Sequence, residues 1–143
     1  MKKRKGIILA GGTGSRLMPM TGLLSKQVLP VYDKPLIYYP LSVLMLARIS
    51  EILVISSPQH LPQIKETILR LGNLGVEFEF ISQPRPEGIA QALILGEEFL
   101  DGSPCALILG DNIFFGDGFC DVLLNADQKG SSAQIFVHQV NKP

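Results

Sequence analysis

The stretch Leu9-Ala10-Gly11-Gly12-Thr13-Gly14-Ser15-Arg16-Leu17 follows directly on an apolar run that covers residues 6–10. A short continuous apolar run is typical of a strand buried on both faces of a parallel sheet. Three glycines after it let the backbone approach a bulky anion, and successive N–H groups can form an anion-binding nest. Arg16 adds a planar cationic group suited to phosphate. An ordinary glycine-rich turn remains the alternative at this point.

The rest of the chain alternates between strand-like and helix-like segments. Apolar runs at 52–55 and 106–109 predict two more buried strands, the alternating run 76–81 predicts an edge strand, and 132–140 is a further candidate. Helical patterns cover 37–49, beginning near Pro40, and then 61–71, 88–100 and 118–128. This order predicts one α/β domain over residues 1–143, with a Rossmann-like, doubly wound and mostly parallel sheet. Ligands of such sheets bind beyond the carboxyl ends of the strands.

Composition narrows the class of protein. Lysines plus arginines and aspartates plus glutamates number 13 each, so the formal net charge is zero and we expect no nucleic-acid partner. No apolar run reaches membrane-spanning length, and the run after the basic start is too short for an export signal. Cys105 and Cys120 have no metal-binding spacing and suggest buried, reduced thiols. His60 and His138 likewise suggest satisfied or surface residues. We therefore expect a cytoplasmic protein without a membrane segment.

Two familiar phosphate-binding loops do not match the glycine-rich stretch. A Walker A loop ends in Gly-Lys-Ser or Gly-Lys-Thr, whereas this loop continues as Ser15-Arg16. A dinucleotide-binding loop needs a further glycine where Leu17 stands, and an acidic residue at the end of the second strand. The second strand instead runs into Ser56 and Ser57. Hydride transfer is therefore disfavoured.

Candidate ligand-binding residues follow the predicted strands. Lys26 lies in a connection of more than twenty residues, a length that is usually functional, although it can also be a solvated lysine. Gln83 follows the edge strand and can pair with the edge of a base, while Gly88 leaves bare backbone at a helix start or simply caps the helix. Asp111 ends the third buried strand, where a carboxylate suits Mg²⁺ or, alternatively, a turn.

The ordered set of motifs is similar to that of the sugar-phosphate nucleotidyltransferases. Residues 9–17 with Pro19 and Thr21 resemble the nucleotide-binding loop of that family. Ser25-Lys26-Gln27, residues 29–30 and residues 32–41 resemble its glucose-1-phosphate thymidylyltransferase branch, whereas uridylyl enzymes typically have Pro-Lys-Glu at 25–27. Ile89 is a conservative departure, because leucine is usual there. The resemblance covers essentially the whole chain.

The resemblance implies a reaction and a site. It implies that dTTP and glucose 1-phosphate form dTDP-glucose and pyrophosphate, with Mg²⁺ as cofactor, for deoxysugar or cell-surface polysaccharide synthesis. Arg16, Lys26 and Asp111 would be catalytic, and Asp111 would also be the metal ligand. The nucleotide would contact Gly11, Gly12, Thr13, Gly14, Ser15, Arg16, Lys26, Gln27, Gln83, Gly88 and Asp111. A homo-oligomer is compatible with it.

Family enzymes are roughly twice as long as this chain. Their second metal carboxylate and the lysine that binds the sugar phosphate lie in the later half, and we find no replacement here. The expectation is therefore the nucleotide-binding half of the fold, truncated before the sugar-binding half. Two hypotheses remain: an enzyme or a piece of one, and a catalytically silent nucleotide-binding domain or partner of a full-length relative.

Overall fold

Four parallel strands form the central sheet of the computed structural model, which describes residues 2–12, 14–126, 133–137 and 139. They are β1 (Lys5–Leu9), β4 (Glu51–Ser56), β5 (Glu77–Ser82) and β6 (Cys105–Leu109), in the spatial order β5-β4-β1-β6. Leu9 lies opposite both Ile55 and Leu109, so the carboxyl ends of three strands are level. The order reverses between β1 and β6, and such a reversal is where α/β sheets bind ligands.

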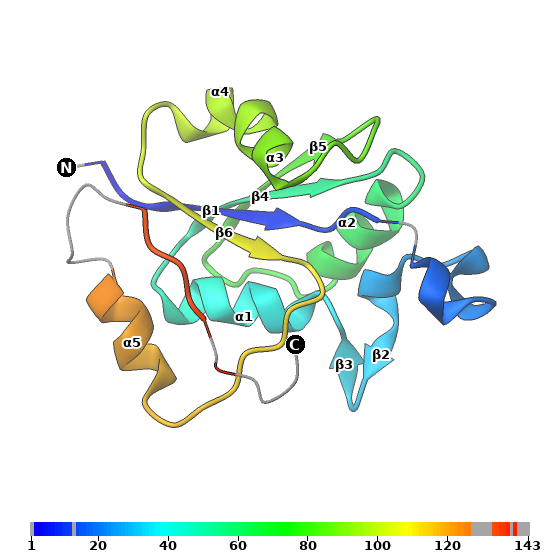
Figure 1. The fold of residues 1–143 in the computed structure, drawn as a ribbon, viewed down its shortest axis with the longest axis horizontal. Coiled ribbons are helices and arrows are strands. Elements are labelled where there is room, and N and C mark those ends of the chain that lie inside the picture. The colour runs from blue at the N-terminus through cyan, green and yellow to red at the C-terminus, as the bar shows by residue number, and fades with distance from the viewer. Residues whose placement is uncertain (1, 13, 127–132, 138, 140–143) are drawn as a thin grey trace.

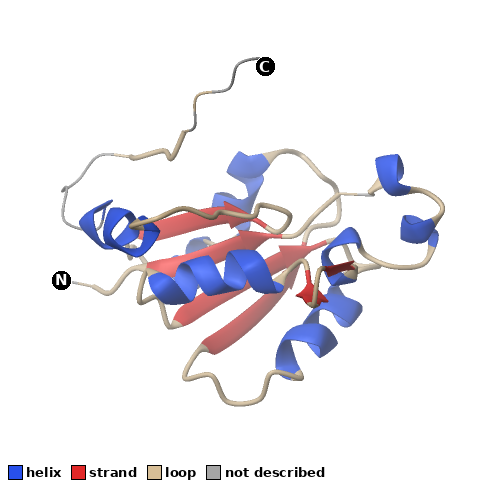
Figure 2. Ribbon diagram, turned by 90° about the horizontal axis from the view of Figure 1, so that it is seen from below, coloured by secondary structure: helices blue, strands red, loops and turns tan. Residues whose placement is uncertain are grey.

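Helices cover both faces of the sheet (Figure 1). They are α1 (Tyr38–Leu46), α2 (Leu61–Leu69), α3 (Ile89–Leu95), α4 (Glu97–Leu100) and α5 (Phe119–Ala126). Residues of α1, α2 and α5 pack on one face with Ile8, Ile52 and Val54, and Figure 2 looks onto that face. Residues of α3 and α4 pack on the other face with Ile7 and Leu53. The predicted doubly wound α/β architecture is therefore confirmed.

Most predicted elements lie where the apolar pattern placed them. β5 is an edge strand with alternating burial, as predicted from residues 76–81. Pro40 is the third residue of α1, where a proline is tolerated because the N–H groups of the first turn have no helical acceptor.

The predicted helix over 88–100 is wrong in one respect, because it divides at Gly96 into α3 and α4. A Cβ at Gly96 would lie 3.0 Å from the Ile7 side chain and 3.2 Å from that of Leu53. Glycine therefore lets the helical backbone rest directly on the sheet, and the helix breaks at this contact.

The predicted strand at 132–140 is also wrong where the structure describes it. Residues 133–137 and 139 form no strand, whereas 132, 138 and 140 lie outside the described residues. Ile135 and Val137 have more than four-fifths of their surface exposed, so the apolar pattern of this segment does not reflect burial.

The long connection between β1 and α1 has its own short elements. Three single turns of 3-10 helix, η1 (Ser15–Leu17), η2 (Met20–Gly22) and η3 (Lys26–Val28), are followed by the antiparallel pair β2 (Pro30–Val31) and β3 (Lys34–Pro35). The Tyr39 hydroxyl donates to the Val31 carbonyl at 2.7 Å and so ties this hairpin to α1. Within the described part of the chain, no helix has the length and hydropathy that a membrane crossing requires.

Candidate nucleotide-binding site

The glycine-rich loop leaves β1 at the point where the strand order reverses. Gly12 and Gly14 have φ angles of 101° and 61°, which residues other than glycine rarely adopt. A Cβ at Gly14 would also lie only 2.8 Å from the Thr21 side chain, whose hydroxyl donates to the Gly14 carbonyl at 2.7 Å. Thr21 therefore fixes the second half of the loop. Thr13, which the sequence assigns to the site, lies outside the described residues.

A buried pair of polar residues holds the first half of the loop. The Gln27 side chain is 3% exposed, and its Nε2 donates to the Gly11 carbonyl at 3.3 Å. The hydroxyl of the fully buried Ser25 donates to Gln27 Oε1 at 2.6 Å. Because its amide is engaged in this way, Gln27 contributes to the site by positioning Gly11.

Lys26, next to Gln27, faces the end of β6. Its Nζ lies 2.8 Å from Asp111 Oδ2, with side-chain exposures of 33% and 37%. The strands can approach here because Gly110 has no side chain: a Cβ would lie 2.9 Å from that of Ala10. Two residues separated by 85 positions in sequence are therefore brought together near the carboxyl ends of β1 and β6.

Gln83 approaches the glycine loop from the other side. Its side chain is 4% exposed, and its Oε1 would be 3.0 Å from a Cβ at Gly11. Gly88, with a φ of 96°, precedes α3, and no atom lies within 4 Å of where its Cβ would stand. The structure thus places the Gln83 amide beside the loop and open backbone at Gly88, where α3 begins.

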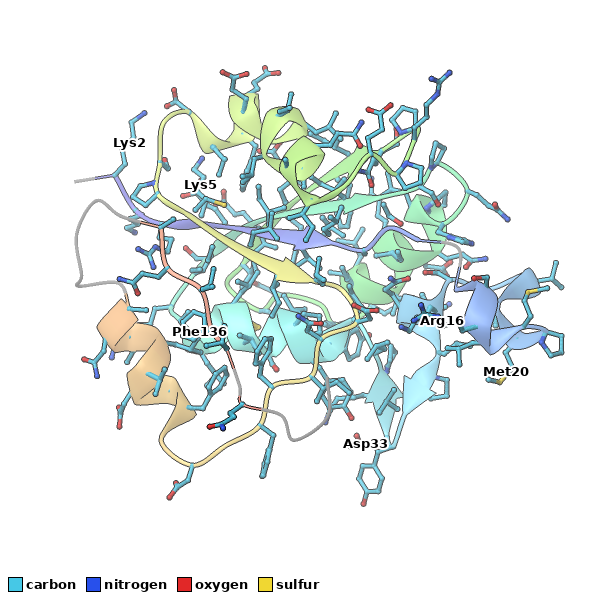
Figure 3. All side chains as sticks on the ribbon, in the orientation of Figure 1. Lys2, Lys5, Arg16, Met20, Asp33 and Phe136 are labelled. Carbon is cyan, nitrogen blue, oxygen red and sulfur yellow. The ribbon has the colours of Figure 1, made fainter. Side chains whose placement is uncertain are left out.

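Arg16 is the predicted site residue that the described structure leaves without a partner. It lies on η1 with an exposed side chain, in the lobe of short turns that projects beyond the strand ends (Figure 3). No hydrogen bond or ion pair to it is found among the described residues. Ser15, in the same turn, is also exposed. Both residues are accessible to a ligand.

Comparison with known proteins identifies the family. Residues 5–143 match the family model described as nucleotidyl transferase. The chain belongs to this family. It is 52% identical over its whole length to the glucose-1-phosphate thymidylyltransferase of Xanthomonas campestris pv. campestris strain B100, and 50% identical over 97% of its length to that of Neisseria meningitidis. Both alignments cover 48% of the relative, so the chain spans about half the length of these proteins.

Solved structures of nucleotidyl transferases share the fold. A Bacillus anthracis protein assigned as a glucose-1-phosphate thymidylyltransferase, crystallised with sucrose, superposes with a TM-score of 0.78 at 40% identity, covering 89% of this chain and 52% of that one. A UDP-glucose pyrophosphorylase in complex with UDP-glucose gives a TM-score of 0.72 at 25% identity, covering 90% and 53%. The expected nucleotidyltransferase fold is confirmed.

Several residues that build this candidate site were not predicted from sequence. Gln63 of α2 accepts from the Ser25 N–H and donates to the Leu23 carbonyl, each at 3.0 Å. Gln91 of α3 accepts from Gln83 Nε2 at 2.5 Å. These contacts join segments 8 to 40 residues apart, and no local sequence pattern marks them. Both glutamines are the third residue of their helix, Gln63 of α2 and Gln91 of α3.

The histidine and cysteine predictions need correction. His60 is buried, and its Nδ1 has no hydrogen-bond partner among the described residues, so it is not the satisfied residue we expected. His138 lies outside the described residues. Cys105 is partly buried, and burial raises the pKa of its thiol to about 11, whereas Cys120 is exposed and its Sγ donates to the Leu46 carbonyl at 3.8 Å. Only Cys105 therefore resembles the buried thiol we expected.

Proposed function

We propose that the chain carries the nucleotide half of a thymidylyl transfer site, which takes dTTP and glucose 1-phosphate to dTDP-glucose and pyrophosphate. The single observation that best supports this is the meeting of Lys26 and Asp111, 2.8 Å apart, beside the glycine loop at the reversal of strand order. A cation, a carboxylate and a glycine-rich backbone at that point suit a triphosphate with its metal. The thymidylyl substrate is proposed from the relatives, of which the chain spans about half.

The proposed reaction needs no covalent intermediate on the protein. A phosphate oxygen of glucose 1-phosphate attacks the α-phosphorus of dTTP, and the new P–O bond forms as the bond to the bridging β-phosphate oxygen breaks. The electron pair leaves with pyrophosphate. Positioning and charge neutralisation are then the main contributions of the protein. Lys26 would hold the triphosphate, and the unpartnered Arg16 would neutralise charge on the departing phosphates.

Asp111 is the residue that would hold Mg²⁺. Its carboxylate, partly exposed at a strand end, is a hard oxygen ligand of the kind that Mg²⁺ prefers. Among the described residues no three histidine, cysteine, aspartate or glutamate side chains form a metal-binding group. A single carboxylate fits Mg²⁺, because phosphate oxygens and water usually complete its coordination. Bound there, the ion would supply further charge neutralisation.

Base choice gives a direct test. Gln83 presents an amide that can pair with a pyrimidine, and Gly88 is open backbone at the start of α3. Calorimetric titration of the chain with dTTP, UTP and ATP, each with Mg²⁺, should give tighter binding of both pyrimidine nucleotides than of ATP. Lys26→Ala should weaken dTTP binding, whereas Lys3→Ala, at an exposed lysine near the amino terminus, should not. Tighter binding of ATP would contradict the proposal.

A second candidate function is nucleotide binding without turnover, alone or in association with a longer relative. It is favoured because, among the described residues, no group of three histidine, cysteine, aspartate or glutamate side chains could hold a metal ion. Release of pyrophosphate from dTTP and glucose 1-phosphate distinguishes the two candidates. In either case the ligand is an intracellular metabolite, so we propose that the chain acts in the cytoplasm. Exposed apolar side chains such as Phe115 could be buried between copies of the chain, so the proposal includes a homo-oligomer.

A further inference from the structure

Gln83 belongs to a short relay of hydrogen bonds that ends on a carboxylate. Gln83 Nε2 donates to Gln91 Oε1 at 2.5 Å, and Gln91 Nε2 donates to Glu87 Oε2 at 2.8 Å. The backbone N–H of Glu87 also donates to Gln91 Oε1, at 3.2 Å. All three residues lie between the end of β5 and the first turn of α3, so the relay is local and its geometry depends on this one connection.

The chemistry of Glu87 fixes the direction of this relay. An ionised carboxylate only accepts hydrogen bonds and a backbone N–H only donates, so the Gln91 amide has one satisfactory orientation between them. Reversing that amide would turn its oxygen toward the carboxylate and its NH₂ group toward the N–H. Gln91 therefore presents Oε1 to Gln83, and Gln83 must donate to it through Nε2. The oxygen and nitrogen positions of both amides follow from this network.

The orientation of Gln83 decides which of its atoms faces the glycine loop. With Nε2 turned to Gln91, Oε1 lies toward Gly11, 3.0 Å from the position of a Cβ there. No hydrogen bond to Gln83 Oε1 is found among the described residues, so this acceptor is free although the side chain is buried. The site therefore offers a base one fixed acceptor, Gln83 Oε1. Beside it lies the N–H of Gln83 Nε2 that is not bonded to Gln91.

We infer that Glu87 and Gln91 set the polarity of Gln83, and that this fixed polarity makes the site select pyrimidines with an N3–H, thymine and uracil, against cytosine. A fixed Oε1 can accept from the N3–H of thymine or uracil. N3 of cytosine carries a lone pair instead, so the same oxygen would face a second acceptor. A glutamine that is free to rotate could reverse its amide and pair with cytosine equally well. This inference rests on the proposed function, because it requires a pyrimidine nucleotide beside Gln83.

The ratio of dissociation constants for dCTP and dTTP measures this selectivity, and we expect dCTP to bind more weakly. Gln91→Leu removes the relay and lets Gln83 rotate, so the ratio should fall by roughly tenfold to a hundredfold, the discrimination that one amide–base pair provides. Glu87→Gln should give a smaller fall, because the Glu87 backbone N–H still favours the original direction. The ratio compares two ligands on one preparation, so loss of folded protein does not change it.

An exchange of the two side-chain types gives the decisive variant. In the double variant Glu87→Gln and Gln91→Glu, the new carboxylate at 91 accepts from Gln83 Nε2, and the new amide at 87 donates to that carboxylate. Gln83 keeps its polarity, so the high ratio should return. Glu98→Gln, an exposed carboxylate on α4, is the matched control and should leave the ratio unchanged. A residue that only stabilises the turn would not produce this loss and recovery.

The outcomes separate this inference from the proposed function. Loss of selectivity in Gln91→Leu and its recovery in the double variant would support the inference. An unchanged ratio in Gln91→Leu, or a double variant that binds dTTP without recovering the ratio, would overturn it and leave dTTP binding intact. A wild-type chain that binds neither dTTP nor UTP would overturn the proposed function itself.

Discussion

Lys26 and Asp111 neutralise each other in the described structure, and the proposed ligands would separate them. Both side chains are about one-third exposed, so their ion pair resembles a surface pair, which is worth about 0–1 kcal/mol. A charge-assisted hydrogen bond to phosphate is typically stronger, at about 1.5–3 kcal/mol. Triphosphate and metal can therefore replace the ion pair between Lys26 and Asp111 without a large loss of folding stability.

Arg16 gives the clearest prediction at a single residue. Arg16→Ala should change the free energy of unfolding by less than about 0.5 kcal/mol, because the exposed side chain has no partner in the described structure. The same change should weaken dTTP binding by roughly tenfold or more, through loss of a charged contact. Calorimetry and thermal unfolding measure the two effects, and in a longer protein that turns over, the rate should fall with the affinity.

Arg70→Ala is the matched control for Arg16. Arg70 is also exposed, and its pair with Glu66 lies on α2 with side-chain exposures of 75% and 66%. It should alter stability by a few tenths of a kcal/mol, as helix-surface pairs do, and leave dTTP affinity unchanged. If Arg16→Ala instead lowers the melting temperature sharply while dTTP still binds, Arg16 is a structural residue.

At the scale of elements, α2 holds the segment that carries Lys26. Both ends of the Gln63 amide bond to the backbone of that segment, at Ser25 and Leu23. From Ser25 the contacts continue through Gln27 to Gly11, so α2, on the same face of the sheet as α1 and α5, is linked to the glycine loop.

Gln63→Ala should therefore loosen η3 and the preceding turn. Two hydrogen bonds at about 1 kcal/mol each would be lost, so we expect a stability decrease of about 1–2 kcal/mol. Hydrogen exchange of the Ser25 amide should accelerate, and dTTP affinity should fall several-fold. Gln59→Ala, an exposed glutamine in the preceding turn, should do neither. An unchanged Ser25 exchange rate in Gln63→Ala would show that α2 does not hold this segment.

Elements could be predicted from sequence where one local pattern decides them. The runs that became β1, β4 and β6 are continuously apolar because both faces are covered, and the alternation of β5 marks an edge. The turns between Gly14 and Leu36 could not be predicted, since side chains such as Thr21, Gln27 and Gln63 define them through distant contacts. The break at Gly96 likewise depends on contact with the sheet.

For the molecule as a whole, the position of the site follows from topology. The glycine loop and Asp111 were predictable as strand-end residues, and they meet because β1 and β6 are neighbours at the reversal of strand order. The relay from Gln83 through Gln91 to Glu87 was not predictable, because glutamine has no characteristic spacing. The chain spans about half the length of its thymidylyltransferase relatives. The transfer reaction of those relatives is therefore a proposal for this chain.

The position of the nucleotide site can be mapped by amide chemical shifts. When dTTP and Mg²⁺ are added to isotope-labelled chain, we expect saturable shifts at Gly11, Lys26, Gln83 and Asp111, which lie near the carboxyl ends of the strands. The amides of α5, which lies toward the opposite ends in Figure 1, should not move. Shifts centred on α5 with the four strand-end amides unchanged would contradict a nucleotide site at the β1–β6 reversal.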